Sequence, residues 1–139
     1  MDMAPWVYNA KKVSILKMIK RSIQNMEATP IEGDNLRGVS MKLLVGREDN
    51  APNFSMRHFL VARDGFTPHH QHPWEHEVLV LSGVGEVECG GDVQSIKGGD
   101  GLLIPSNEMH QFRNIGDAPL EFLCIVPVDS DCGETVPGS

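Results

Sequence analysis

The chain has 139 residues, of which 40% are hydrophobic and 22% charged, and its formal net charge is −7. This length suits one domain with its own core, and the acidic balance argues against nucleic acid or an anionic membrane as the main partner. No apolar run approaches the roughly 20 residues of a membrane span. The first residues lack a secretion signal, and the three cysteines show no CxxC spacing. We therefore expect a cytoplasmic protein.

The chain divides into three parts by composition. Residues 1–20 are predicted to form a peripheral N-terminal segment, in which apolar residues fit helical turns or an edge strand equally well. Residues 21–128 are predicted to form the single folded domain, and residues 129–139 a polar C-terminal tail.

Strand-sized apolar runs alternate with Gly, Pro, Asn and Asp throughout the predicted domain. The runs cover residues 39–45, 54–62, 76–81, 85–89, 93–96, 102–104, 109–114 and 120–126. Thr29-Pro30, Asp64-Gly65 and Ser82-Gly83 are typical turn dipeptides between or before these runs. Because helical periodicity is almost absent, the pattern predicts an all-β antiparallel sandwich or barrel.

Four of the six histidines lie within residues 67–77. His70, His72 and His76 share one parity, so in extended backbone their side chains point to the same side. His110 has the parity of Phe112 on a later run, which predicts that it points inward from a second strand. Burying several imidazoles without a metal would leave their nitrogens unsatisfied, so we predict a metal site. His69 breaks the parity and is predicted to be a loop residue that hydrogen-bonds nearby.

Two stretches of the sequence resemble the motifs of the cupin superfamily, G(X)5HXH(X)3,4E(X)6G and G(X)5PXG(X)2H(X)3N. The second motif is matched by Gly99, Pro105, His110 and Asn114. Asn107 replaces its middle glycine, and asparagine tolerates the left-handed turn that a glycine there permits.

The first motif is matched in part. His70 and His72 fit, Gly65 is one residue too close, and His76 stands where the motif has glutamate. Glu77 lies one residue further on and shares a face with Leu79 rather than with the histidines. We therefore predict His76, rather than Glu77, as the fourth ligand.

The resemblance covers roughly residues 18–128 and is closest to small single-domain cupins with a four-histidine site. It implies a double-stranded β-helix, also called a jelly-roll β-barrel, that commonly forms a homodimer. It also implies one divalent metal ion, bound by His70, His72, His76 and His110. The resemblance favours manganese or iron, whereas imidazole ligands by themselves also suit Zn, Ni or Cu.

A four-imidazole site keeps the 2+ charge of its metal, whereas three histidines and one glutamate lower the charge to 1+. The higher charge makes a stronger Lewis acid and favours anionic oxygen ligands. We therefore expect a metal-dependent oxidoreductase of dioxygenase type that acts on a small chelating substrate with enol, phenol or keto oxygens. A non-oxidative isomerase or lyase, and a cupin that binds or senses a small molecule without turnover, are the alternatives.

Residues around the predicted site follow from parity. Because Glu121 marks the outward face of its run, Phe122, Cys124 and Val126 are predicted to point inward, either into a pocket or into the core. Arg57 and His58 have opposite parities, so one of them is expected to face inward, and an inward Arg57 would suit a substrate carboxylate. The substrate-pocket candidates are Arg57, Trp74, Phe112, Phe122 and Cys124. Glu75 and Glu77 are candidates for holding an imidazole N–H.

Overall fold

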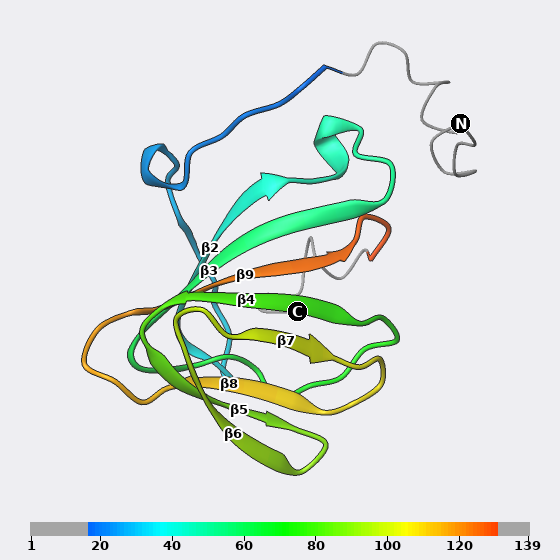
Figure 1. Ribbon diagram of the computed structural model, residues 1–139. Helices are drawn as coiled ribbons and strands as arrows, with labels where there is room; N and C mark the ends of the chain where they lie inside the picture. The colour runs from blue at the N-terminus through cyan, green and yellow to red at the C-terminus, as the bar shows by residue number, and fades with distance from the viewer. Residues whose placement is uncertain (1–16, 131–139) are drawn as a thin grey trace.

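The computed structural model describes residues 17–130 (Figure 1). Most of the predicted N-terminal segment and most of the predicted tail, residues 1–16 and 131–139, lie outside this range. Residues 17–20 are exposed and have no regular secondary structure. The predicted domain boundaries therefore stay predictions.

Every apolar run that was expected to be a strand is one, so the all-β prediction is confirmed. The strands are β1 (Thr29–Pro30), β2 (Arg37–Val45), β3 (Phe54–Phe66), β4 (His76–Ser82), β5 (Val84–Cys89), β6 (Asp92–Lys97), β7 (Gly101–Ile104), β8 (His110–Asn114) and β9 (Leu120–Pro127). Two 3-10 turns, η1 (Ile23–Asn25) and η2 (Arg47–Asp49), are the helical elements of the described residues. No helix within residues 17–130 is long and apolar enough to span a membrane.

The strands form one antiparallel sheet that curls into two layers (Figure 1). Strand β3 joins the layers, because β2 pairs with one of its edges while β9 and then β8 pair with the other. One layer contains β2, β3, β9, β4 and β7, and the other contains β8, β5 and β6. The two layers enclose a barrel interior, which is the arrangement expected of a jelly roll.

Two of the predicted turns are wrong, because both dipeptides belong to strands. Asp64-Gly65 does not end β3, which continues to Phe66 through an irregularity in its pairing with β2. Asp64 adopts φ 65° there, and a Cβ at Gly65 would lie 2.6 Å from the carbonyl oxygen of Arg37. The dipeptide is thus a β-bulge, in which glycine permits close backbone approach. Thr29-Pro30 is a two-residue edge strand paired with β2.

The barrel interior is filled by the residues that strand alternation predicts. The expected inward residues of β9, namely Phe122, Cys124 and Val126, are all buried. Phe122 stacks between Phe59 and Phe112, with ring centroids 5.4 and 4.6 Å apart. These three rings belong to the hydrophobic core of the barrel.

The turn before β8 confirms the expectation for Asn107, which adopts φ 64° where a glycine would be usual. The backbone N–H of Asn107 donates to the carbonyl oxygen of His72 at 2.8 Å. At the far end of β8, the Asn114 amide donates to the carbonyl oxygens of Val61 and Ala118, both at 2.9 Å. The Asn107 bond ties the turn before β8 to the loop that carries the histidines, and the Asn114 bonds tie the end of β8 to β3 and to the loop before β9.

Candidate metal centre

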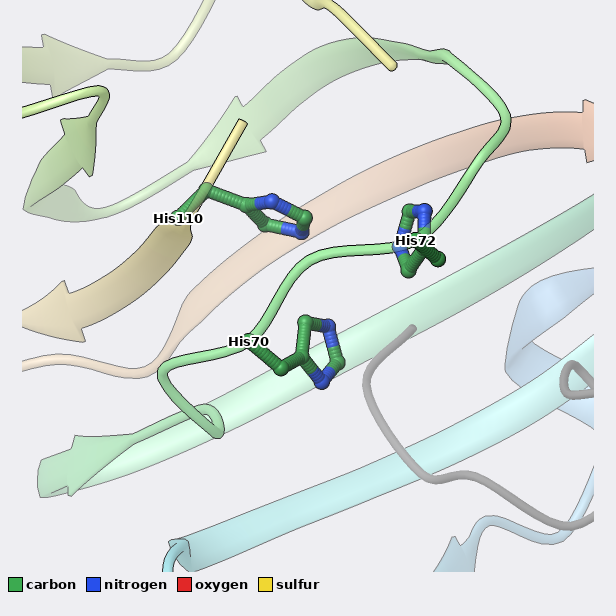
Figure 2. Close-up of side chains that lie close together, drawn as sticks. All are labelled: His70, His72 and His110. Carbon is green, nitrogen blue, oxygen red and sulfur yellow. The ribbon is translucent and has the colours of Figure 1, made fainter. Parts of the chain in front are cut away.

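The four predicted ligands come from two segments that are adjacent only in three dimensions (Figure 2). His70 and His72 lie on the loop between β3 and β4, His76 begins β4 and His110 begins β8. The backbones of His70 and His110 form an antiparallel bridge with N–H···O distances of 3.1 and 2.8 Å. Because the loop is bonded to β8, its imidazoles are held in place even though it is not a strand.

The imidazoles converge on one another. His70, His72 and His110 each offer a ring nitrogen, and these nitrogens all lie within 4.8 Å of one another. His76 joins the group through His72, since their Nε2 atoms are 2.6 Å apart and their rings stack with centroids 4.3 Å apart. Figure 2 shows the rings of His70, His72 and His110 turned toward a common point. We refer to these four residues as the imidazole cluster.

In His72, His76 and His110, the second ring nitrogen, Nδ1, has a partner outside the cluster. The carbonyl oxygens of Trp74 and Glu108 accept hydrogen bonds from Nδ1 of His72 and His110, at 3.1 and 2.9 Å. A carbonyl only accepts, so the proton of each ring sits on Nδ1 and the lone pair on Nε2. His76 Nδ1 lies 2.8 Å from the Cys124 sulfur. Within the described residues, Nε2 of His70 and of His110 is buried without a hydrogen-bond partner.

Burial keeps these imidazoles neutral. Burial, which is the largest cause, acts together with the neighbouring imidazoles and Arg57 to lower the pKa of His70 and His72 to about 4 and that of His76 to about 2. Burial also lowers the pKa of His110. A metal binds the neutral form of imidazole, so the cluster offers lone pairs rather than protons at neutral pH. Buried lone pairs without donors, on rings oriented by carbonyls, fit a divalent metal ion.

Arg57 and Cys124 extend the cluster into the barrel. Arg57 Nη2 donates toward the Cys124 sulfur at 3.6 Å, and the same sulfur contacts His76. The guanidinium also lies over the Phe59 ring, 5.2 Å from its centroid. Arg57 and His58 point to opposite faces of β3, and Arg57 is the one that faces inward; both are buried, with exposed fractions of 2% and 1%. His58 is on the other face of β3 and lies 2.9 Å from Glu121.

A cavity of about 420 Å³ lies beside Arg57. The described residues that line it are Met41, Leu43, Gly46, Arg47, Glu48, Ser55, Arg57, Val126, Val128 and Ser130. Arg57 is thus the one substrate-pocket candidate on this wall. Sequence reasoning missed Ser55, although it shares the parity of Arg57, and missed Arg47 and Glu48, which follow the end of β2 where strand parity gives no direction.

The other candidates have different surroundings. Phe112 and Phe122 belong to the aromatic stack of the core, which is the alternative that was open for Phe122. Trp74 stacks on His72, with centroids 4.5 Å apart and planes 8° apart, so it packs against the cluster itself. His69 lies 3.2 Å from Glu88, outside the cluster, as expected of a loop residue.

Glu75 and Glu77 are exposed and lie against each other, which raises the pKa of Glu77. For His72, His76 and His110, the partner of Nδ1 is a carbonyl or a sulfur rather than either glutamate. The carboxylates point outward because Glu77 has the outward parity of β4, whereas His76 is buried.

Comparison with known proteins identifies the family. The Cupin domain family, Cupin_2, matches residues 57–126, which is half of the chain. The chain is a cupin. The predicted superfamily and jelly-roll fold are therefore confirmed, and the matched residues include the whole imidazole cluster.

Curated relatives of this cupin share part of its length. It is 34% identical over 76 residues to 1-methylthio-D-xylulose 5-phosphate methylsulfurylase from Rhodospirillum rubrum, covering 55% of this chain and 49% of that protein. It is 41% identical over 49 residues to polyketide synthase CurC from Streptomyces cyaneus, covering 34% and 32% of the two chains. The match thus spans half or less of these relatives.

Solved structures match a larger share of this chain than the curated relatives do. The polyketide cyclase RemF from Streptomyces resistomycificus superimposes with a TM-score of 0.75 and 26% identity, covering 81% of each chain. A cupin-2 domain protein from Rhodospirillum rubrum gives a TM-score of 0.69 and 28% identity, covering 81% of this chain and 76% of that one. The fold is thus shared with a protein named as an enzyme, the polyketide cyclase RemF.

Proposed function

We propose that this cupin is a metal-dependent enzyme of the four-histidine type, in which His70, His72, His76 and His110 hold one divalent metal ion. The observation that carries the proposal is the convergence of neutral, oriented imidazoles. A cavity of about 420 Å³ has Arg57 on its wall, and Arg57 contacts the Cys124 sulfur, which in turn contacts His76. A pocket of this size accommodates a small molecule. The substrate that suits it is one whose enol, phenol or keto oxygens bind a metal.

The donor set supports this class of substrate. Within the described residues, no carboxylate belongs to the cluster of possible ligands, so the ligands leave the charge of the metal unreduced. When bound, such an ion supplies Lewis acidity that polarises substrate oxygens and lowers the pKa of an enol or phenol. Manganese and iron remain the favoured metals, on the resemblance to four-histidine cupins, and imidazole donors also accept Zn, Ni or Cu.

The first candidate reaction is oxygen insertion of the dioxygenase type. It is supported by the environment of the histidines outside the cluster, because His58 and His69 are engaged by Glu121 and Glu88. A non-oxidative reaction needs a general base, and the titratable candidates that the sequence offers are these two histidines and the flanking Glu75 and Glu77, which are exposed. Glu48, at the wall of the cavity, is the remaining acidic candidate among the described lining residues.

The second candidate is a non-oxidative reaction through an enolate. It is favoured by the names of two relatives, a methylsulfurylase and a polyketide cyclase, neither of which is named as an oxygenase. This reaction needs a group that moves a proton, and Glu48 would fill that role.

The test begins with metal analysis of protein purified without added metal or a nickel column. Manganese-, iron- and zinc-loaded samples are then incubated with a panel of enediols, phenols and 1,3-diketones, in air and under strict anaerobiosis. Turnover only in air with oxygen uptake supports the dioxygenase. Turnover without oxygen that is lost in Glu48→Gln supports the non-oxidative reaction. Binding seen by manganese EPR with no turnover in either condition would identify a sensing protein instead.

We also propose a homodimer. Leu79, Leu81 and Leu103 are 44%, 39% and 61% exposed on the outer face of β4 and β7. Exposed leucines gathered on neighbouring strands are typical of a protein interface, and a second copy is the occupant that a cupin fold suggests. Light scattering of the wild type and of Leu79→Glu, which places a charge in the patch, tests it, since a monomeric wild type contradicts the proposal.

A further inference from the structure

One ring of the imidazole cluster is oriented by a side chain rather than by the backbone. Nδ1 of His72 and Nδ1 of His110 each face a backbone carbonyl oxygen, whereas Nδ1 of His76 lies 2.8 Å from the sulfur of Cys124. A backbone carbonyl is present whatever side chain its residue carries. The orientation of His76 therefore depends on the identity of residue 124, which is 48 positions away in the sequence.

The register of the sheet fixes the place of this sulfur. Strand β9 lies between β3 and β4, so Cys124 pairs with Arg57 on one side and with Val78 on the other. His76 is two residues before Val78, and both side chains point to the buried face of β4. Cys124 is itself 2% exposed. A side chain enclosed by close-packed neighbours keeps one position, so the thiol is held beside the His76 ring.

The second contact of the sulfur shows that it accepts hydrogen bonds. Arg57 Nη2 lies 3.6 Å from the Cys124 sulfur, and a guanidinium N–H only donates. The sulfur therefore offers a lone pair to Arg57. A thiol sulfur has two lone pairs, so the second is available to an N–H on its other side, where His76 lies.

We propose that Cys124 is a positioning residue of the metal centre, whose sulfur accepts the Nδ1 proton of His76 and so leaves the Nε2 lone pair of that ring for the metal. The inference rests on the proposed function, because the lone pair matters only if His76 is a ligand. A neutral imidazole carries one N–H, so a partner that accepts at Nδ1 selects the tautomer with a free Nε2. Cys124 thereby does for His76 what backbone carbonyls do for His72 and His110.

The contact between His76 and His72 defines the competing arrangement. Their Nε2 atoms are 2.6 Å apart, and His72 carries its proton on Nδ1. With the proposed tautomer two lone pairs meet at this point, which is favourable when a cation binds both. In the competing arrangement the thiol of Cys124 donates to Nδ1 of His76, and Nε2 of His76 donates to His72. The two arrangements differ in which nitrogen of His76 carries the proton, and the second prevents His76 from binding a metal through Nε2.

Substitutions at residue 124 separate the acceptor from the packing. Cys124→Val fills the space of the thiol without an acceptor, whereas Cys124→Ser keeps one. In competition with a chelator of known affinity, Cys124→Val is expected to bind zinc about 10–100-fold more weakly than the wild type, and Cys124→Ser more tightly than Cys124→Val. Val80→Ala, which truncates a side chain that is 1% exposed on the same face of β4, keeps the wild-type affinity. Wild-type affinity in Cys124→Val, or equal losses in Cys124→Val and Cys124→Ser, overturns the proposal.

Nitrogen-15 NMR of the histidine rings gives a readout that a loss of packing alone would not produce. In the zinc-loaded wild type, which is diamagnetic, His76 should be protonated at Nδ1, and protonation at Nε2 overturns the proposal. The Nδ1 proton of His76 should move upfield in Cys124→Val, because its hydrogen bond is lost. The corresponding signals of His72 and His110 should stay, since their partners are carbonyls.

A metal-free sample separates this inference from the proposed function. The contact between Cys124 and His76 does not need the metal, so the ring nitrogen signals of His76 should differ between metal-free wild type and metal-free Cys124→Val. Unchanged signals overturn the role of Cys124 whether or not zinc binds. Changed signals in a protein whose wild type binds no zinc support the contact and contradict the proposed function instead.

Discussion

Two buried histidine sites on opposite faces of the same sheet differ in what surrounds them. On the outer face, His58 is 1% exposed, and its Nε2 lies 2.9 Å from the Glu121 carboxylate, which also accepts a hydrogen bond from Ser82 at 3.0 Å. On the inner side, His76 and His110 are each 2% exposed, but their neighbours are other imidazoles, backbone carbonyls and a thiol.

The difference teaches how to recognise a ligand among buried histidines. His58 has an anionic partner at Nε2, and although its Nδ1 is buried without a hydrogen-bond partner among the described residues, His58 does not belong to a group of converging imidazoles. In the imidazole cluster the Nδ1 sides of two rings are used by carbonyls, while Nε2 of His70 and His110 has no partner among the described residues. Burial of a histidine is therefore uninformative until the partner of each ring nitrogen is known.

The largest effect is expected from removing a member of the cluster. His76→Ala should weaken metal binding by more than the about 10–100-fold that is typical of losing a residue that only supports a ligand. Glu77→Ala is the matched control, since it removes the neighbouring side chain on the outward face. Competition with a chelator of known affinity measures both, and equal losses in the two variants would contradict the choice of His76.

A substitution at the outer histidine site, formed by His58 and Glu121, should lower the stability of the protein and leave metal binding unchanged. Glu121→Ala leaves the buried Nε2 of His58 without its carboxylate, which is expected to cost about 1–3 kcal/mol of the free energy of unfolding. Urea denaturation of the metal-free protein measures this loss, and metal stoichiometry serves as the control. Loss of metal in Glu121→Ala at unchanged stability would show that the two histidine sites are not independent.

The pH dependence of the cluster follows from its lowered pKa values. The unfolded chain binds protons at an ordinary histidine pKa near 6.5, whereas folded His70 and His72 do so only near 4. Stability is therefore fully present above pH 6.5 and falls as the pH is lowered from 6.5 toward 4, because the unfolded state takes up more protons. Thermal unfolding of metal-free wild type and His72→Gln across this range tests the sign. A wild type that becomes more stable on acidification contradicts it.

The smallest effect is expected at Trp74, whose ring stacks on His72 while its backbone carbonyl accepts the His72 Nδ1 proton. Trp74→Phe keeps the carbonyl and a flat ring, so we expect metal affinity to change by no more than about 10-fold, the lower end for a supporting residue. Trp74→Ala removes the stack and should lose more. If Trp74→Phe and Trp74→Ala lose equally, the stack does not orient His72.

Much of the site was predictable because successive side chains of a strand point to opposite faces of the sheet, so that the position in the sequence fixes the side on which each residue lies. The choice of His76 over Glu77 as the inward residue, the inward face of β9 and the left-handed turn at Asn107 all follow from rules of two-residue alternation and backbone sterics. The same rule placed Arg57 and His58 on opposite faces of β3, but it decided neither which of them faces inward nor that both are buried. Burial on the outer face depends on segments far along the chain, which parity does not encode.

By itself, the sequence determined the class of fold, the strands and the four histidines that share one side, since these depend on local alternation and spacing. Only the tertiary structure decided which partners complete the centre. The bridge between the backbones of His70 and His110, the Cys124 sulfur between His76 and Arg57, and the cavity lined by residues of β2, β3 and β9 all require segments that the fold brings together. Distances across a curled sheet depend on its register and curvature, and these are set by the packing of the whole barrel.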